Sequence, residues 1–119
     1  MSEMPPRIVC LCGSTRFMNA FFAAGWEFTL AGEIVLSVGV CKHADHHGAE
    51  ALGAGVADAL DELHLRKIDM ADRVFVLNVG GYVGESTRRE VLYAIEHHKP
   101  VTWLEPSRIP PDLKEESDV

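Results

Sequence analysis

The chain has 119 residues, of which 47% are hydrophobic, and a formal net charge of −7 with its six histidines counted as neutral. This length suits one domain, and the apolar fraction suffices for one continuous core. The acidic balance argues against a surface that binds nucleic acid or an anionic membrane, because either would require a basic patch. It does not exclude a small anionic ligand, since one arginine and a few backbone amides suffice for a phosphate.

No apolar run approaches the roughly 20 residues needed to span a bilayer, and the chain does not open with a basic region followed by an apolar stretch, so we expect a cytoplasmic protein that does not enter a membrane. Cys10 and Cys12 lie two residues apart in an apolar run and would face the same side of a strand. We interpret them as buried small side chains in a reducing compartment, with a redox or metal role as the alternative. We therefore expect no metal site and no cofactor.

Apolar runs typical of buried strands alternate along the chain with helical periodicity. A strand at residues 8–12 ends before a helix that Ser14 or Thr15 would cap and Gly32 would stop. The following elements are expected to be a strand at 34–40, a helix at 52–70, a strand at 74–79, a helix at 86–98 and a strand at 101–104. For the second helix, spacing predicts an apolar face that consists of Leu52, Val56, Leu60, Leu63 and Met70.

This order predicts an α/β fold, a three-layer sandwich of the Rossmann or flavodoxin kind. Its parallel sheet would have four to five strands, with helices on both faces. Residues 1–104 would form the single domain, and residues 105–119, rich in proline and charge, would form a polar tail that is disordered or lies over the surface. Ligands of such sheets bind at the carboxyl ends of the strands. Three loops are therefore candidates, at residues 13–16, 40–48 and 78–86.

The first loop reads Gly13-Ser14-Thr15-Arg16. Gly13 would let the backbone approach a ligand, and the following helix would point free N–H groups at the same place. Ser14 and Thr15 add hydroxyl groups, and Arg16 adds a charge that suits a phosphate. The alternative is a tight turn with a hydroxyl cap and a solvated arginine.

The third loop begins at Asn78, contains Gly84 and leads through Ser86 into the last helix. Glu90, in the first turn of that helix, would be a nucleophile or base at the mouth of the sheet. The spacing from Thr87 to Glu90 is also that of a capping box, in which the carboxylate bonds back to the cap N–H. From the pattern alone the cap is the favoured interpretation.

The second loop contains His43 and Asp45 within one packed polar run. Zinc ligands usually come from separated segments, so we expect residues that reach a ligand here rather than a metal site. On the second helix Asp61 and His64 lie three residues apart and therefore share a face near one end of the crevice. Acidic residues on a helix are most often a solvated face.

From residue 8 to about residue 104 the chain resembles the nucleoside 2-deoxyribosyltransferase superfamily, and within it the 2′-deoxynucleoside 5′-monophosphate N-glycosidases. The sequence CGSTR at residues 12–16 is similar to the turn that holds the 5′-phosphate in those enzymes. His43-Ala44-Asp45 is similar to a loop that flanks the nucleoside. The segment 71–94 is similar to an arrangement in which an Ala-Asp pair, a strand and a loop precede the catalytic glutamate.

The resemblance implies that Glu90 attacks the anomeric carbon of a nucleotide or nucleoside and forms a glycosyl-enzyme intermediate. Water would then complete a hydrolysis, and a second base would complete a transfer. His64 stands where the family has an acidic residue, and Asp61, one turn earlier, is the candidate to replace it in positioning the leaving base. The family also implies a homodimer or higher homo-oligomer.

Two other functions fit the same motifs. A non-catalytic nucleotide-binding or sensing module would keep the turn at 12–16 without using Glu90, and the His64 substitution favours it. A phosphoribohydrolase of the lysine-decarboxylase-like kind has a glycine-rich loop followed by a glutamate, to which residues 80–86 correspond loosely.

Overall fold

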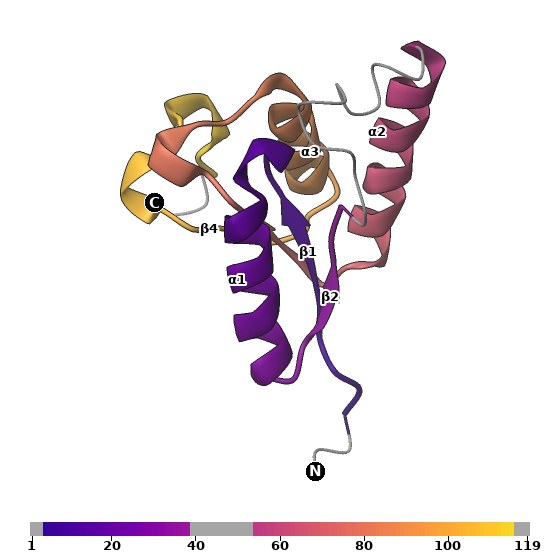
Figure 1. The fold of residues 1–119 in the computed structure, drawn as a ribbon, viewed down its shortest axis with the longest axis vertical. Helices are drawn as coiled ribbons and strands as arrows, with labels where there is room; N and C mark the ends of the chain where they lie inside the picture. The colour runs from indigo at the N-terminus through magenta and orange to yellow at the C-terminus, as the bar shows by residue number, and fades with distance from the viewer. Residues whose placement is uncertain (1–3, 39–53, 116–119) are drawn as a thin grey trace.

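The computed structural model describes residues 4–38 and 54–115. Figure 1 shows their order as β1 (Ile8–Cys12), α1 (Met18–Leu30), β2 (Ile34–Leu36), α2 (Ala54–Met70), β3 (Arg73–Val76), α3 (Glu85–Glu96) and β4 (Val101–Trp103). Short 3₁₀ turns precede α1, follow β3 and follow β4. The predicted elements are all present, although the strands predicted at 34–40 and 74–79 are shorter, and residues 39–53 lie outside the described part of the chain.

The four strands form one parallel sheet in the order β2-β1-β3-β4. The chain leaves β1 for β2 on one side and later crosses to β3 on the other, so the strand order reverses between β1 and β3. In open α/β sheets, ligands bind at the carboxyl ends of the strands beside such a reversal. The sheet confirms the predicted parallel topology, and the turns that follow Cys12 and Val76 are the ones that lie beside the reversal.

Alternate residues of β1 face two separate apolar cores, one on each side of the sheet. Val9 and Leu11 pack with Phe21 and Ala24 of α1. Cys10 and Cys12 point the other way, toward the layer formed by α2 and α3. On that side the buried side chains are those of Ile68, Ala71, Val74, Val76, Val91, Ala94, Val101 and Leu113. One helix on one face and two on the other give the three-layer sandwich that the sequence predicts (Figure 1).

The buried face of α2 differs from the predicted one. Leu60, Leu63 and Met70 are exposed, Met70 at 64%, so their assignment to the core was wrong. His64 and Ile68 are buried instead and face β1 and α3. The helix therefore presents a histidine to the sheet and leaves Leu60 and Leu63 at the surface. A buried histidine needs hydrogen-bond partners, and His64 finds them in the Leu11 carbonyl and the two thiols of β1.

Residues 105–115 lie over the surface, and residues 116–119 lie outside the described chain. Arg88 of α3 pairs with Asp112, and Leu113 is only 1% exposed within the core beside α3. The expectation that this segment has little to bury was therefore wrong at Leu113. Its burial ties the end of the chain to the same layer that carries the candidate site.

Three large apolar side chains of α1, those of Phe22, Trp26 and Leu30, are exposed along one side of the helix. A groove of about 360 Å³ beside them is lined mainly by apolar groups. A homodimer of the kind that the sequence predicts would cover such a face, and it stays a prediction. In the part of the chain that the structure describes, no helix combines the length and apolarity needed to cross a bilayer.

Leu113→Ala is expected to lower the free energy of unfolding by about 2–5 kcal/mol, because it removes a fully enclosed side chain and leaves a cavity. Urea denaturation followed by circular dichroism measures the effect. Leu104→Ala, at a leucine that is 40% exposed, is the matched control and should cost less than about 1 kcal/mol. Equal costs for the two variants would show that the end of the chain does not pack as described.

Candidate functional site

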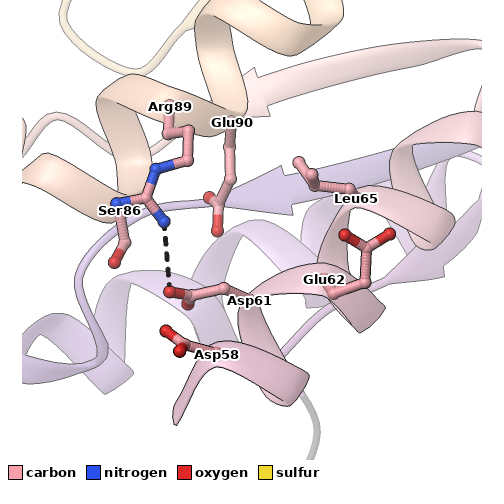
Figure 2. A pocket seen from close by; sticks show the side chains of 7 residues that line it. All are labelled: Asp58, Asp61, Glu62, Leu65, Ser86, Arg89 and Glu90. Carbon is pink, nitrogen blue, oxygen red and sulfur yellow. Dashed lines mark hydrogen bonds and ion pairs between the residues drawn. The ribbon is translucent and has the colours of Figure 1, made fainter. Parts of the chain in front are cut away.

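A small cavity of about 130 Å³ lies between α2 and α3. Figure 2 shows Ser86, Arg89 and Glu90 reaching it from α3, opposite residues of α2. The α2 residues that line it are Asp58, Asp61, Glu62 and Leu65. Arg89 Nη1 lies 3.3 Å from Asp61 Oδ2 and so joins the two helices at the rim. The cavity thus contains four carboxyl groups and one guanidinium group.

The backbone at Gly84 decides where Glu90 points. Gly84 is the N-cap of α3 with an extended backbone, and its carbonyl accepts a hydrogen bond from Arg88 N at 2.9 Å. The helix therefore begins at Glu85, two residues before the predicted cap, and Thr87 is buried inside it. The capping-box interpretation of Thr87 and Glu90 was wrong. Glu90 lies in the second turn, where its carboxylate is free to face α2.

Glu90 is a shielded carboxyl group, with a side chain that is 13% exposed. Burial raises its pKa to about 7, although His64 nearby acts in the opposite direction. Its Oε1 lies 3.9 Å from His64 Nε2. A carboxyl group that exchanges its proton near neutral pH, beside a cavity, is a candidate for acid, base or nucleophile chemistry.

His64 meets the end of β1 through one ring nitrogen. Its Nε2 lies 3.1 Å from the carbonyl oxygen of Leu11, 3.6 Å from Cys10 Sγ and 3.5 Å from Cys12 Sγ. Burial alone would lower the pKa of His64, but Cys10 and Glu90 outweigh it and raise the pKa. Contact with Cys12 lowers the pKa of the Cys10 thiol to about 6, and the pKa of Cys12 is raised, chiefly by its contact with Cys10.

The turn after β1 lies at the carboxyl edge of the sheet, as predicted for a phosphate site. A Cβ at Gly13 would lie 3.0 Å from Leu77 Cβ, so the close approach of this turn to the residue after β3 favours glycine. Ser14 accepts a hydrogen bond from Arg16 N and so caps the 3₁₀ turn at Thr15–Phe17. The helix that Ser14 or Thr15 was predicted to cap, α1, instead begins after Phe17 and has no side-chain cap. The Arg16 guanidinium lies over the Tyr82 ring, 4.5 Å from its centroid, which brings the first and third loops together.

Asn78 is placed away from the cavity. Its amide donates to the carbonyl oxygens of Glu105 and Arg108, and its own carbonyl accepts from Glu105 N. Both amide hydrogens are therefore used within the protein, and the residue anchors the chain after β4 rather than offering donors to a ligand.

Apart from Asn78, the predicted site residues divide into three groups. Asp61, Ser86 and Glu90 line the cavity, and His64 Nε2 lies 3.9 Å from Glu90 Oε1 without lining it. Gly13, Ser14, Thr15 and Arg16 form a turn that begins directly after Cys12, and Gly84 positions α3 without lining the cavity. His43 and Asp45 lie outside the described residues.

Sequence reasoning missed that Cys10 and Cys12 meet His64. The only available signal was their two-residue spacing, which places both thiols on one face of β1. It did not indicate that the histidine of α2 would face them.

A comparison with models of protein families found no match, and a comparison with curated proteins found no significant match.

Asn78→Ala is expected to lower the free energy of unfolding by about 2–4 kcal/mol, because it leaves the backbone groups of Glu105 and Arg108 without their buried partner. Thermal and urea unfolding measure the loss. Asn19→Ala, at an exposed position of α1, is the matched control and should change stability by less than about 0.5 kcal/mol. A stable Asn78→Ala protein would mean that the amide does not hold this segment.

Proposed function

We propose that the protein cleaves the N-glycosidic bond of a nucleoside or deoxynucleoside 5′-monophosphate, or transfers its sugar to another base, through a covalent glycosyl–Glu90 intermediate. The observation that carries the proposal is the position of Glu90. Its side chain, 13% exposed, borders the cavity between α2 and α3 and lies 3.9 Å from His64, which in turn contacts the Leu11 carbonyl of β1.

The surroundings of Glu90 suit a nucleophile. A carboxylate that has shed most of its water attacks an anomeric carbon more readily than a hydrated one. With its pKa raised to about 7, a substantial fraction of Glu90 is ionised at neutral pH.

The charge of the cavity suits the sugar and the leaving base better than the phosphate. Asp58, Asp61, Glu62 and Glu90 contribute four carboxyl groups against the single guanidinium of Arg89. Such a surface repels a phosphate but stabilises the positive charge that develops on the sugar ring in an oxocarbenium-like transition state. Asp61, held in place by Arg89, is the group we assign to positioning or protonating the leaving base.

The phosphate is assigned to the turn at residues 13–16. The cavity of about 130 Å³ is smaller than the ~300–1,000 Å³ of a typical ligand pocket, so it would hold only part of a nucleotide. The turn carries the guanidinium of Arg16 and the hydroxyl groups of Ser14 and Thr15, which suit a phosphate. A phosphate bound there would orient the sugar toward Glu90.

The second candidate is a nucleotide-binding module without catalysis. One observation favours it. His64 is buried against β1 instead of lining the cavity. The enzymes that the sequence resembles have an acidic residue at this position. The two candidates differ in whether Glu90 is required for a chemical step, and the next experiment separates them.

Incubation with a panel of deoxynucleoside and ribonucleoside 5′-monophosphates, with and without an acceptor base, is expected to release free base that chromatography can quantify. Glu90→Gln should reduce the rate by at least about 10³-fold, because it removes the attacking carboxylate while keeping the shape of the side chain. The substrate that reacts fastest in the panel would define the preferred base and sugar.

Glu85→Gln is the matched control, since Glu85 is an exposed carboxylate on the same helix and does not line the cavity. It should react at the wild-type rate. The absence of base release from every nucleotide by folded wild-type protein would refute the enzymatic proposal and leave the binding module.

Arg16→Gln is expected to lower kcat/KM for the 5′-monophosphate by about 10- to 100-fold, because a charge-assisted contact with the phosphate is lost. The same variant tested on the corresponding nucleoside, which has no phosphate, provides the control and should match wild type within about twofold. An equal loss on both substrates would show that Arg16 acts on the fold or on the sugar and not on the phosphate.

A further inference from the structure

The end of β1 and the inner face of α2 place two thiols and an imidazole together. Cys10 Sγ, Cys12 Sγ and His64 Nε2 all lie within 4.8 Å of one another, and all three residues are buried. Within residues 4–38 and 54–115 they are the only group of three histidine, cysteine or carboxylate ligands so arranged. Neither the glycosidase nor the binding module requires the two thiols.

We propose that Cys10, Cys12 and His64 bind a zinc ion. The spacing of the donor atoms supports this assignment. Zinc binds sulfur at about 2.3 Å and imidazole nitrogen at about 2.0–2.1 Å, and tetrahedral angles then separate a sulfur from a nitrogen ligand by about 3.5 Å. The observed distances from Nε2 to the two sulfurs are 3.6 and 3.5 Å. Each sulfur therefore already has the separation from the imidazole nitrogen that a shared zinc ion requires, and the two sulfurs lie within 4.8 Å of each other.

The hydrogen-bonding capacity of His64 points the same way. Four polar atoms surround Nε2: the Leu11 carbonyl oxygen, the two sulfurs and Glu90 Oε1. One ring nitrogen carries either one hydrogen or one lone pair and can satisfy only one of them. A metal ion at the centre of the sulfurs and Nε2 binds all three at once, with two thiolates to balance its charge. The buried assembly is then neutral, which limits the cost of keeping it in the core.

The chemistry of the ligands selects the metal. Thiolate and imidazole donors favour zinc over the hard cations that prefer oxygen.

Glu90 borders this site without being one of its ligands. An oxygen and a nitrogen on one tetrahedral zinc would lie about 3.4 Å apart, whereas Glu90 Oε1 is 3.9 Å from Nε2. We therefore leave the fourth position to water. The zinc assignment does not depend on the glycosidase proposal, because metal content is measured without substrate.

The test uses tag-free wild-type protein purified under reducing conditions without chelator. Elemental mass spectrometry is expected to find about one zinc per chain after dialysis. Removal of zinc and addition of Co²⁺ should give a near-ultraviolet thiolate-to-cobalt charge-transfer band and visible bands of tetrahedral Co²⁺. Folded protein that retains no zinc and develops no charge-transfer band would overturn the proposal.

Variants locate the ion. His64→Gln and the double variant Cys10→Ala/Cys12→Ala should each weaken zinc binding by more than about 100-fold, since loss of a ligand exceeds the 10- to 100-fold cost of losing a ligand's supporting contact. His97→Gln, at an exposed histidine of the surface, is the matched control and should keep the metal. Zinc retained by the folded double variant would also overturn the assignment.

Because a ligand variant can fail to fold, circular dichroism accompanies each measurement, and the cobalt spectrum of the wild type tests the zinc site without any substitution.

Glu90→Gln separates the zinc proposal from the enzymatic one. It should abolish base release while keeping about one zinc per chain, because Glu90 is not assigned as a ligand. Loss of zinc in folded Glu90→Gln would contradict the three-ligand assignment.

Discussion

The contact of His64 with the end of β1 is the interaction on which the rest of the site depends. Through one ring nitrogen the histidine joins α2 to the carbonyl oxygen of Leu11, to two thiols of β1 and, at 3.9 Å, to Glu90 of α3. His64 shares the buried face of α2 with Ile68, while Asp61 of the same helix lines the cavity and Leu60 and Leu63 are exposed. The face that α2 turns to the sheet therefore combines a polar and an apolar side chain.

The charged side chains form two regions of opposite sign, one at the cavity between α2 and α3 and one at the turn after β1. Between α2 and α3 the carboxyl groups of the cavity outnumber the single guanidinium of Arg89, which suits a cationic transition state and a polar base. At the turn after β1, the guanidinium of Arg16 favours an anion. Glu90 stands on the carboxylate-rich side, and the separation of the two charges would orient a nucleotide that spans both parts. A chain with a net charge of −7 can bind a phosphate in this way because the cation is local.

The features of the fold that depend on neighbouring residues in the sequence could be predicted from the sequence pattern. The alternation of strands and helices and the tight turn at Gly13 follow from hydrophobic period and backbone constraint, and both are found. The start of α3 was predicted to within one residue, but the capping box at Thr87 was wrong because Gly84 is the N-cap of the helix. The meeting of His64 with Cys10 depends on how α2 rotates against the sheet, a tertiary property that helical spacing does not contain.

A covalent bond between Glu90 and the sugar is the step that distinguishes the proposed enzyme from a binding module. Rapid acid quenching of the protein with its fastest nucleotide substrate, followed by intact-mass and peptide mass spectrometry, detects that bond. We predict a transient mass increase equal to one sugar phosphate, located on the peptide that contains Glu90 and absent from Glu90→Gln. Base release without any adduct, or an adduct that maps to Asp61, would contradict the assignment of Glu90 as the nucleophile.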